Sequence, residues 1–223
     1  DFVTPRALET AEIPALIASY VQAAQNAIAA GFDGVEVHAG NGYLLDQFLR
    51  SSTNQRADAY GGSKENRARL LQEVLAAVSA AIGNDRVGLR LSPVTPFNDI
   101  SDAAPQETFN YVVSQLNPLN LAFLDILQGT GGMPQEQWLP FDYGQLRALY
   151  SGNLILNNGF DFASGQKALE SGAADAIAYG RMLLANPDLV ERFRCGAELN
   201  QPDYTRLYMG EEKGYIDYPF LSN

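Results

Sequence analysis

Apolar residues along the chain follow two patterns: short continuous runs, and longer segments with apolar positions three and four residues apart. The first long segment, residues 10–30, predicts a helix that buries one face, and Gly31 ends it. Ser63 is a suitable N-cap for a second helix, with Glu65 in its first turn and an apolar stripe that reaches Ile82. Further helices are expected near residues 105–116, 142–150, 163–171 and 187–195.

The short apolar runs predict strands between these helices. We expect them at residues 32–38, 87–91, 123–127, 154–157 and 176–179. A repeated strand–helix alternation predicts a parallel sheet with helical crossovers, and strands that are apolar on both faces are typical of such sheets. Two α/β architectures fit this order, an open doubly wound sheet and a (β/α)8 TIM barrel.

Polar residues at the strand ends favour the barrel. A dinucleotide-binding doubly wound sheet carries G-x-G-x-x-G after its first strand, and the sequence lacks this motif there. In a barrel, the active site lies at the carboxyl ends of the strands. The polar and glycine residues at these positions are His38, Arg90, Ser92, Gln128, Asn157, Asn158, Gly180 and Arg181. A closed barrel needs eight strands. Three are therefore not visible, so we expect residues 1–223 to form a single barrel domain that is incomplete at its N-terminus.

Composition narrows the classes of partner. The formal charge is -11 with no basic run, which argues against nucleic-acid binding. One cysteine, Cys195, and one histidine cannot build a Cys/His metal cluster, so no metal is expected. The cysteine count fits the reducing cytoplasm. No apolar run reaches the roughly 18 residues that a membrane span needs.

The segment His38-Ala-Gly-Asn41-Gly-Tyr43 carries the first candidate chemistry. An imidazole N–H and a carboxamide N–H that converge on one point would bind a carbonyl oxygen, more strongly as negative charge collects on it. A tyrosine two residues further on could deliver a proton. A polar turn with a packed tyrosine explains the same residues equally well, so the local pattern leaves both interpretations open.

Two further patterns point to an anionic or strongly accepting ligand. Arg90 ends a buried strand and needs such a partner, which could be a cofactor's ring carbonyl or phosphate, or a carboxylate such as Glu36 on the same side of the sheet. Asn157-Asn158-Gly159 and Gly180-Arg181 each follow a strand, where barrels commonly bind phosphate through backbone N–H groups. Ordinary turn chemistry is the alternative for these glycine-containing segments.

The order of the motifs over nearly the whole chain resembles the Old Yellow Enzyme family. The matching motifs are His38-x-x-Asn41-x-Tyr43, Asn54-x-Arg56-x-Asp58-x-Tyr60-Gly-Gly-Ser63-x-Glu65-Asn66-Arg67, Arg90-Leu-Ser-Pro93, Tyr179-Gly180-Arg181 and Gly214-Tyr215-Ile-Asp217-Tyr218-Pro219. The resemblance implies a (β/α)8 barrel that holds FMN, with this chain covering about strands 4–8 and the C-terminal segment.

The resemblance also implies residue roles. His38 and Asn41 would bind the substrate's carbonyl or nitro oxygen, and Tyr43 would donate the proton. The residues that would bind FMN are Arg90, Asn158, Gly159, Gly180 and Arg181. Phe97 and Tyr208 would line the substrate cavity. The loop around 129–138 could not be aligned to the family and supports no site prediction.

The activity implied by the resemblance is an NAD(P)H-dependent ene-reductase. NADPH or NADH would reduce FMN, and the flavin would then reduce an α,β-unsaturated carbonyl, nitroalkene or maleimide in a ping-pong cycle. The alternative is an inactive or complementation-dependent barrel fragment, which binds FMN only when a companion polypeptide or missing segment supplies the first strands.

Overall fold

The computed structural model describes residues 5–130, 136, 138–207, 209 and 211–221, and its centre is a parallel five-stranded sheet in the order β1-β2-β3-β4-β5. The strands are β1 (Val35–Ala39), β2 (Val87–Leu91), β3 (Phe123–Leu127), β4 (Leu154–Asn157) and β5 (Ala176–Ala178). Each strand pairs with the next one along the chain. Because such crossovers are right-handed, this order places the connecting helices on one face of the sheet, as in a barrel and unlike a doubly wound sheet.

Helices connect the strands as the sequence predicts, with boundaries that differ by a few residues. The α-helices of the described residues are α1 (Ile13–Ala29), α2 (Leu44–Leu49), α3 (Lys64–Ile82), α4 (Pro105–Ser114), α5 (Tyr143–Leu149), α6 (Phe162–Glu170), α7 (Arg181–Ala185) and α8 (Leu189–Cys195). Short 3-10 turns are η1 (Thr10–Glu12), η2 (Asn84–Arg86), η3 (Phe97–Asp99) and η4 (Asn117–Leu119). The expected N-cap is confirmed, since the Ser63 hydroxyl accepts a hydrogen bond from the Asn66 backbone N–H at 3.3 Å.

Three sequence predictions about the elements were incomplete or wrong. Helices α2 and α7 were not predicted, because six and five residues are too few for a helical period to become visible. The first strand was predicted to begin at Phe32, but it begins at Val35. Phe32 is 66% exposed and lies in the turn after α1, so its apolar side chain does not mark a buried strand position.

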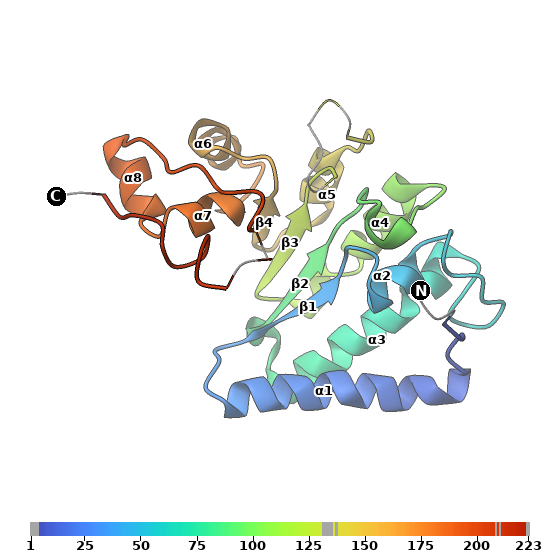
Figure 1. The fold of residues 1–223 in the computed structure, drawn as a ribbon. Helices are drawn as coiled ribbons and strands as arrows, with labels where there is room; N and C mark the ends of the chain where they lie inside the picture. Colours follow the sequence, from blue (N-terminus) through green and yellow to red (C-terminus); the bar gives the residue numbers. More distant parts are fainter. Residues whose placement is uncertain (1–4, 131–135, 137, 208, 210, 222–223) are drawn as a thin grey trace.

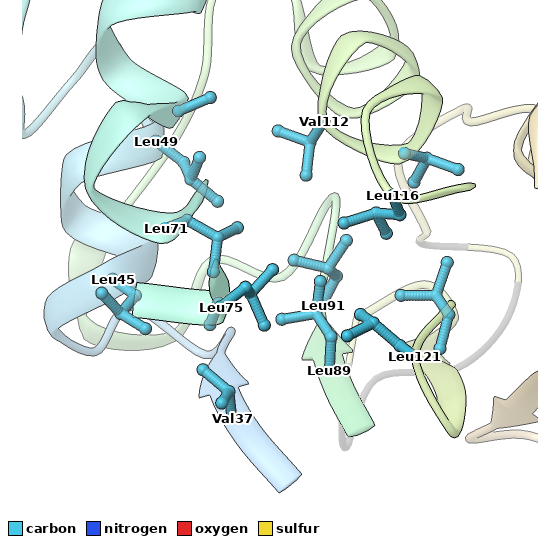
Figure 2. Close-up of a cluster of buried hydrophobic side chains, with 14 of the residues drawn as sticks. Val37, Leu45, Leu49, Leu71, Leu75, Leu89, Leu91, Val112, Leu116 and Leu121 are labelled. Atoms are coloured by element: carbon cyan, nitrogen blue, oxygen red, sulfur yellow. The ribbon is translucent and has the colours of Figure 1, made fainter. Parts of the chain in front are cut away.

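The hydrophobic core fills the space between the sheet and its helices. Alternate strand residues such as Val37, Leu89 and Leu91 point toward α3 and α4. There they lie near Leu71 and Leu75 of α3 and Val112 of α4 (Figure 2). Helix α1 packs along α3 on the same side (Figure 1). Within the described residues, no helix is both long enough and apolar enough to cross a membrane. The other face of the sheet carries the polar residues of the candidate site.

Candidate active site on the inner face of the sheet

Three charged or titratable side chains lie in one row across neighbouring strands. In the strand register His38 of β1 pairs with Arg90 of β2, and Arg90 pairs with Asp125 of β3. Since paired residues of parallel strands point to the same face, all three side chains lie on the face opposite the helices. The sheet therefore brings together residues that are separated by 52 and 35 positions in the sequence.

Asp125 is the carboxylate that meets Arg90. Arg90 Nη1 lies 3.8 Å from Asp125 Oδ2, and the Asn157 side-chain amide donates a hydrogen bond to Asp125. Sequence analysis named Glu36 as a possible partner of Arg90, but the structure gives that contact to Asp125. Burial raises the pKa of Glu36 to about 7, and the negative charge of Asp125 acts in the same direction. Arg90 thus pairs with Asp125, yet its Nε is buried without a hydrogen-bond partner among the described residues.

His38 and Tyr43 lie side by side at the end of β1. Their ring centroids are 5.5 Å apart at an interplanar angle of 54°. Burial lowers the pKa of His38, and the positive charge of Arg90 lowers it further, so the imidazole is mainly neutral at pH 7. Tyr43 is 57% exposed and occupies the N-cap position of α2. A neutral imidazole with one N–H and an accessible phenol therefore share one end of the sheet.

Asn41 lies in the turn between His38 and Tyr43, with unused hydrogen-bonding capacity. Its backbone has φ 56, its backbone N–H donates to Ser92 Oγ at 2.6 Å, and its carbonyl accepts from the Asn98 side chain at 2.9 Å. The side-chain Oδ1 is buried and has no partner in the described part of the chain. The backbone contacts fix the turn, and the side-chain oxygen remains a buried acceptor that a bound donor group could satisfy.

A buried ion pair contacts the turn that contains Asn41, and sequence analysis did not identify this pair. Arg50 and Asp46 are 1% and 0% exposed, and Arg50 Nε donates to Asp46 Oδ1 at 2.6 Å. Arg50 also donates to the carbonyls of Ser92 and Pro93, while Asp46 accepts the Gly42 backbone N–H at 3.0 Å. The pair therefore ties the turn after β1 to the turn after β2.

A cavity of about 800 Å³ opens beside this row, over the carboxyl ends of β4 and β5. Its lining includes all the residues predicted to bind the cofactor, together with Phe97. These lining residues are Arg90, Phe97, Asn158, Gly159, Gly180 and Arg181. The residues His38, Asn41 and Tyr43 do not line it. They are adjacent to it, because His38 is the register partner of Arg90 and Phe97 precedes the Asn98 that contacts Asn41.

The far end of the cavity is built from two turns. Asn158 and Gly159 have φ 73 and 82, and Gly180 is the N-cap of α7. The Arg181 guanidinium lies 5.9 Å above the centre of the Tyr204 ring. The two turns and the Arg181 guanidinium thus lie in one cavity, at the positions where the sequence predicted a phosphate site.

Sequence reasoning missed several residues of this region. The segment from Leu199 to Tyr204 lines the cavity, although its sequence has no periodicity to place it. Asp125 was also missed, despite one available signal: it is an acidic residue inside the otherwise apolar strand Phe123–Leu127. Tyr208, predicted to line the substrate cavity, lies outside the described residues.

The chain is similar to flavin-dependent reductases over nearly its whole length. It is 51% identical to the probable flavin mononucleotide-dependent alkene reductase of Leishmania infantum, with 99% of this chain and 59% of that protein covered. It superposes on morphinone reductase with a TM-score of 0.93 and 45% identity, covering 99% of this chain and 59% of that chain. It also superposes on the old yellow enzyme from Trypanosoma cruzi with a TM-score of 0.94 and 37% identity, with the same coverage.

These similarities confirm the resemblance inferred from the motifs and the barrel class of the fold, of which this chain forms a part. The chain spans about 59% of the length of the relatives described above. The model of one family, described as NADH:flavin oxidoreductase / NADH oxidase, matches residues 1–200. The chain belongs to the NADH:flavin oxidoreductase / NADH oxidase family.

Proposed function

We propose that the protein formed by this chain is an FMN-dependent ene-reductase that uses NADPH or NADH. Its substrates would be small molecules with an activated C=C bond, namely α,β-unsaturated carbonyls, nitroalkenes or maleimides. When bound, FMN supplies the hydride chemistry that amino-acid side chains lack. Relatives named for flavin-dependent alkene reduction and for morphinone reduction support the proposal.

The observation that carries the proposal is the placement of two arginines in one cavity. Arg90 lies at the end near His38, and Arg181 lies near the turns at 158–159 and 180. A planar ring with carbonyl acceptors and a phosphate tail would match these two ends. The buried, unpartnered Nε of Arg90 supports the fit, because a ring carbonyl or nitrogen would give that donor the acceptor it lacks.

In the proposed arrangement Arg181 and the backbone N–H groups of Asn158, Gly159 and Gly180 hold the phosphate. A guanidinium can bind phosphate through two parallel hydrogen bonds, which fixes orientation as well as position. Arg90 donates to the polar edge of the ring, and the ion pair with Asp125 fixes the position of the Arg90 side chain. These residues bind and orient the cofactor.

The substrate chemistry is assigned to the end of β1. Neutral His38 donates its N–H to the substrate's carbonyl or nitro oxygen, and the Asn41 amide donates a second hydrogen bond, so both stabilise negative charge that collects there. Tyr43, exposed beside His38, gives its proton to the α-carbon. Phe97, half exposed at the cavity wall, and Tyr208 are proposed to contact the apolar part of the substrate.

The visible absorption spectrum of the native preparation tests the cofactor assignment. A flavin spectrum is expected, and a preparation free of bound flavin would refute the proposal.

The substrate role of His38 is tested by titration with a phenol, whose phenolate resembles the charged intermediate. His38→Ala is expected to weaken phenol binding on the order of a hundredfold. The flavin spectrum of the variant without phenol serves as the control, and unchanged phenol affinity would contradict the role.

The surroundings of this chain are also part of the proposal. We propose that residues 1–223 belong to one barrel domain and that a companion polypeptide or a further segment supplies the remaining strands. The 59% coverage of the relatives supports strands beyond these residues, and native mass spectrometry on the coloured species would separate a longer chain from a companion polypeptide. A cytoplasmic location is proposed from the single cysteine in 223 residues.

A further inference from the structure

Trp138 packs against the backbones of two loops that follow neighbouring strands. Gly129 follows β3 and Gly159 follows β4, with φ of 58 and 82. A Cβ added to Gly129 would overlap the indole, and one added to Gly159 would lie 2.7 Å from Trp138 Cη2. The indole therefore lies against both glycines, at a distance that leaves no room for a side chain on either loop.

Hydrogen bonds join the same two loops. Asn158 Nδ2 donates to the Gln128 carbonyl at 2.7 Å, and the Gln128 backbone N–H donates to the Asn157 carbonyl at 3.0 Å. The Gly129 backbone N–H donates to Tyr143 Oη at 2.6 Å. Burial raises the pKa of Tyr143 to about 12, so this hydroxyl stays protonated at neutral pH. Tyr143 at the start of α5 thus holds Gly129, and Gln128 in turn is hydrogen-bonded to Asn158 in the loop after β4.

The loop after β4 lines the cavity. Asn158 and Gly159 line it, whereas Trp138 does not. The indole occupies the side of Gly159 to which a side chain would point, so it contacts the loop without covering the cavity wall. A glycine loop has high conformational freedom, and ordering it only when a ligand binds would reduce affinity. A rigid aromatic ring against the backbone removes part of that freedom beforehand.

We infer that Trp138 is a positioning residue for the phosphate group of the cofactor: it holds the Asn158–Gly159 backbone in the shape that binds the phosphate, from the side away from the ligand. The inference rests on the proposed FMN site. It assigns a role to Trp138, which lies in a part of the chain for which the sequence supported no prediction.

The test compares FMN with riboflavin, which has the same ring and side chain but no phosphate. The natural protein that contains this chain is freed of flavin, and both dissociation constants are measured by flavin fluorescence for wild type and variants. For Trp138→Ala we expect FMN binding to weaken by about tenfold, the equivalent of about one to two lost hydrogen bonds, while riboflavin binding changes less than about twofold. Trp138→Phe, which keeps a flat ring, is expected to retain most of the preference for FMN.

Two controls make the outcome decisive. Leu139→Ala removes a 58% exposed side chain from the next position and is expected to leave both dissociation constants unchanged. Trp138→Leu keeps apolar volume without the ring. If Trp138→Ala does not fold, the FMN and riboflavin dissociation constants are compared in Trp138→Leu instead, with the same expected loss of preference for FMN. Equal weakening of both flavins, or no weakening of either, would overturn the inference. Wild-type protein that binds neither flavin would instead refute the proposed cofactor.

Discussion

Replacement of Arg50 by methionine is the sharpest test of how the fold supports the site. The guanidinium makes two hydrogen bonds to Asp46, at 2.6 and 3.3 Å, and donates to the carbonyls of Ser92 and Pro93. Its plane also lies 4.6 Å from the centre of the Phe109 ring. Methionine fills similar volume but leaves the Asp46 carboxylate and two carbonyls without this donor.

The expected loss is large because both partners are almost fully buried. Removal of one partner of a buried ion pair costs about 3–5 kcal/mol in the free energy of unfolding, since the remaining charge is left without compensation. The matched control is Arg194→Met. Arg194 pairs with Glu191 at the surface, where the two side chains are 69% and 54% exposed, and such pairs contribute about 0–1 kcal/mol.

Denaturant-induced unfolding followed by circular dichroism measures both losses on the same protein. The double variant Asp46→Leu/Arg50→Met extends the test, because replacing both charges removes the unpaired carboxylate. We expect the double variant to be more stable than the sum of the single losses predicts. A loss below about 1 kcal/mol for Arg50→Met, or strict additivity in the double variant, would refute the reasoning that uncompensated charge sets the cost.

Two further predictions concern Tyr43, the N-cap of α2, and Glu36 of β1. For Tyr43→Phe we expect flavin reduction by NADPH at the wild-type rate and slower oxidation by an alkene, measured by stopped-flow absorbance of the two half-reactions; wild-type rates in both would remove Tyr43 as proton donor. Glu36 has its pKa raised from 4.5 to about 7 in the folded protein, so the folded state binds its proton more tightly than the unfolded state does. Its stabilising contribution is present in full below about pH 4.5 and is lost as the pH rises through about 7. Glu36→Gln is therefore expected to flatten the decline of unfolding free energy over that range, and an unchanged pH profile would contradict the shift.

The periodicity of apolar residues determined the strand–helix order and most element boundaries. This part of the fold is readable because an amphipathic helix repeats its buried face every three or four residues, as in residues 10–30. A strand buried on both faces is instead a short continuous apolar run, as in residues 123–127. The motifs around His38 and Arg181 added the family, because fixed spacing among many residue types seldom arises by chance. Helix α2 was not predicted, because its six residues make fewer than two turns and show no apolar period.

Only the tertiary structure decided which side chains meet across the sheet. Asp125 became the partner of Arg90 through the register of β2 with β3, and a one-residue change of register would have turned it to the other face. Trp138 came to lie against Gly129 and Gly159 because two loops after neighbouring strands end at the same edge. Such contacts join residues far apart in the sequence. Local periodicity carries no information about them, because the assembly of the whole sheet decides which strands are neighbours and in which register they pair.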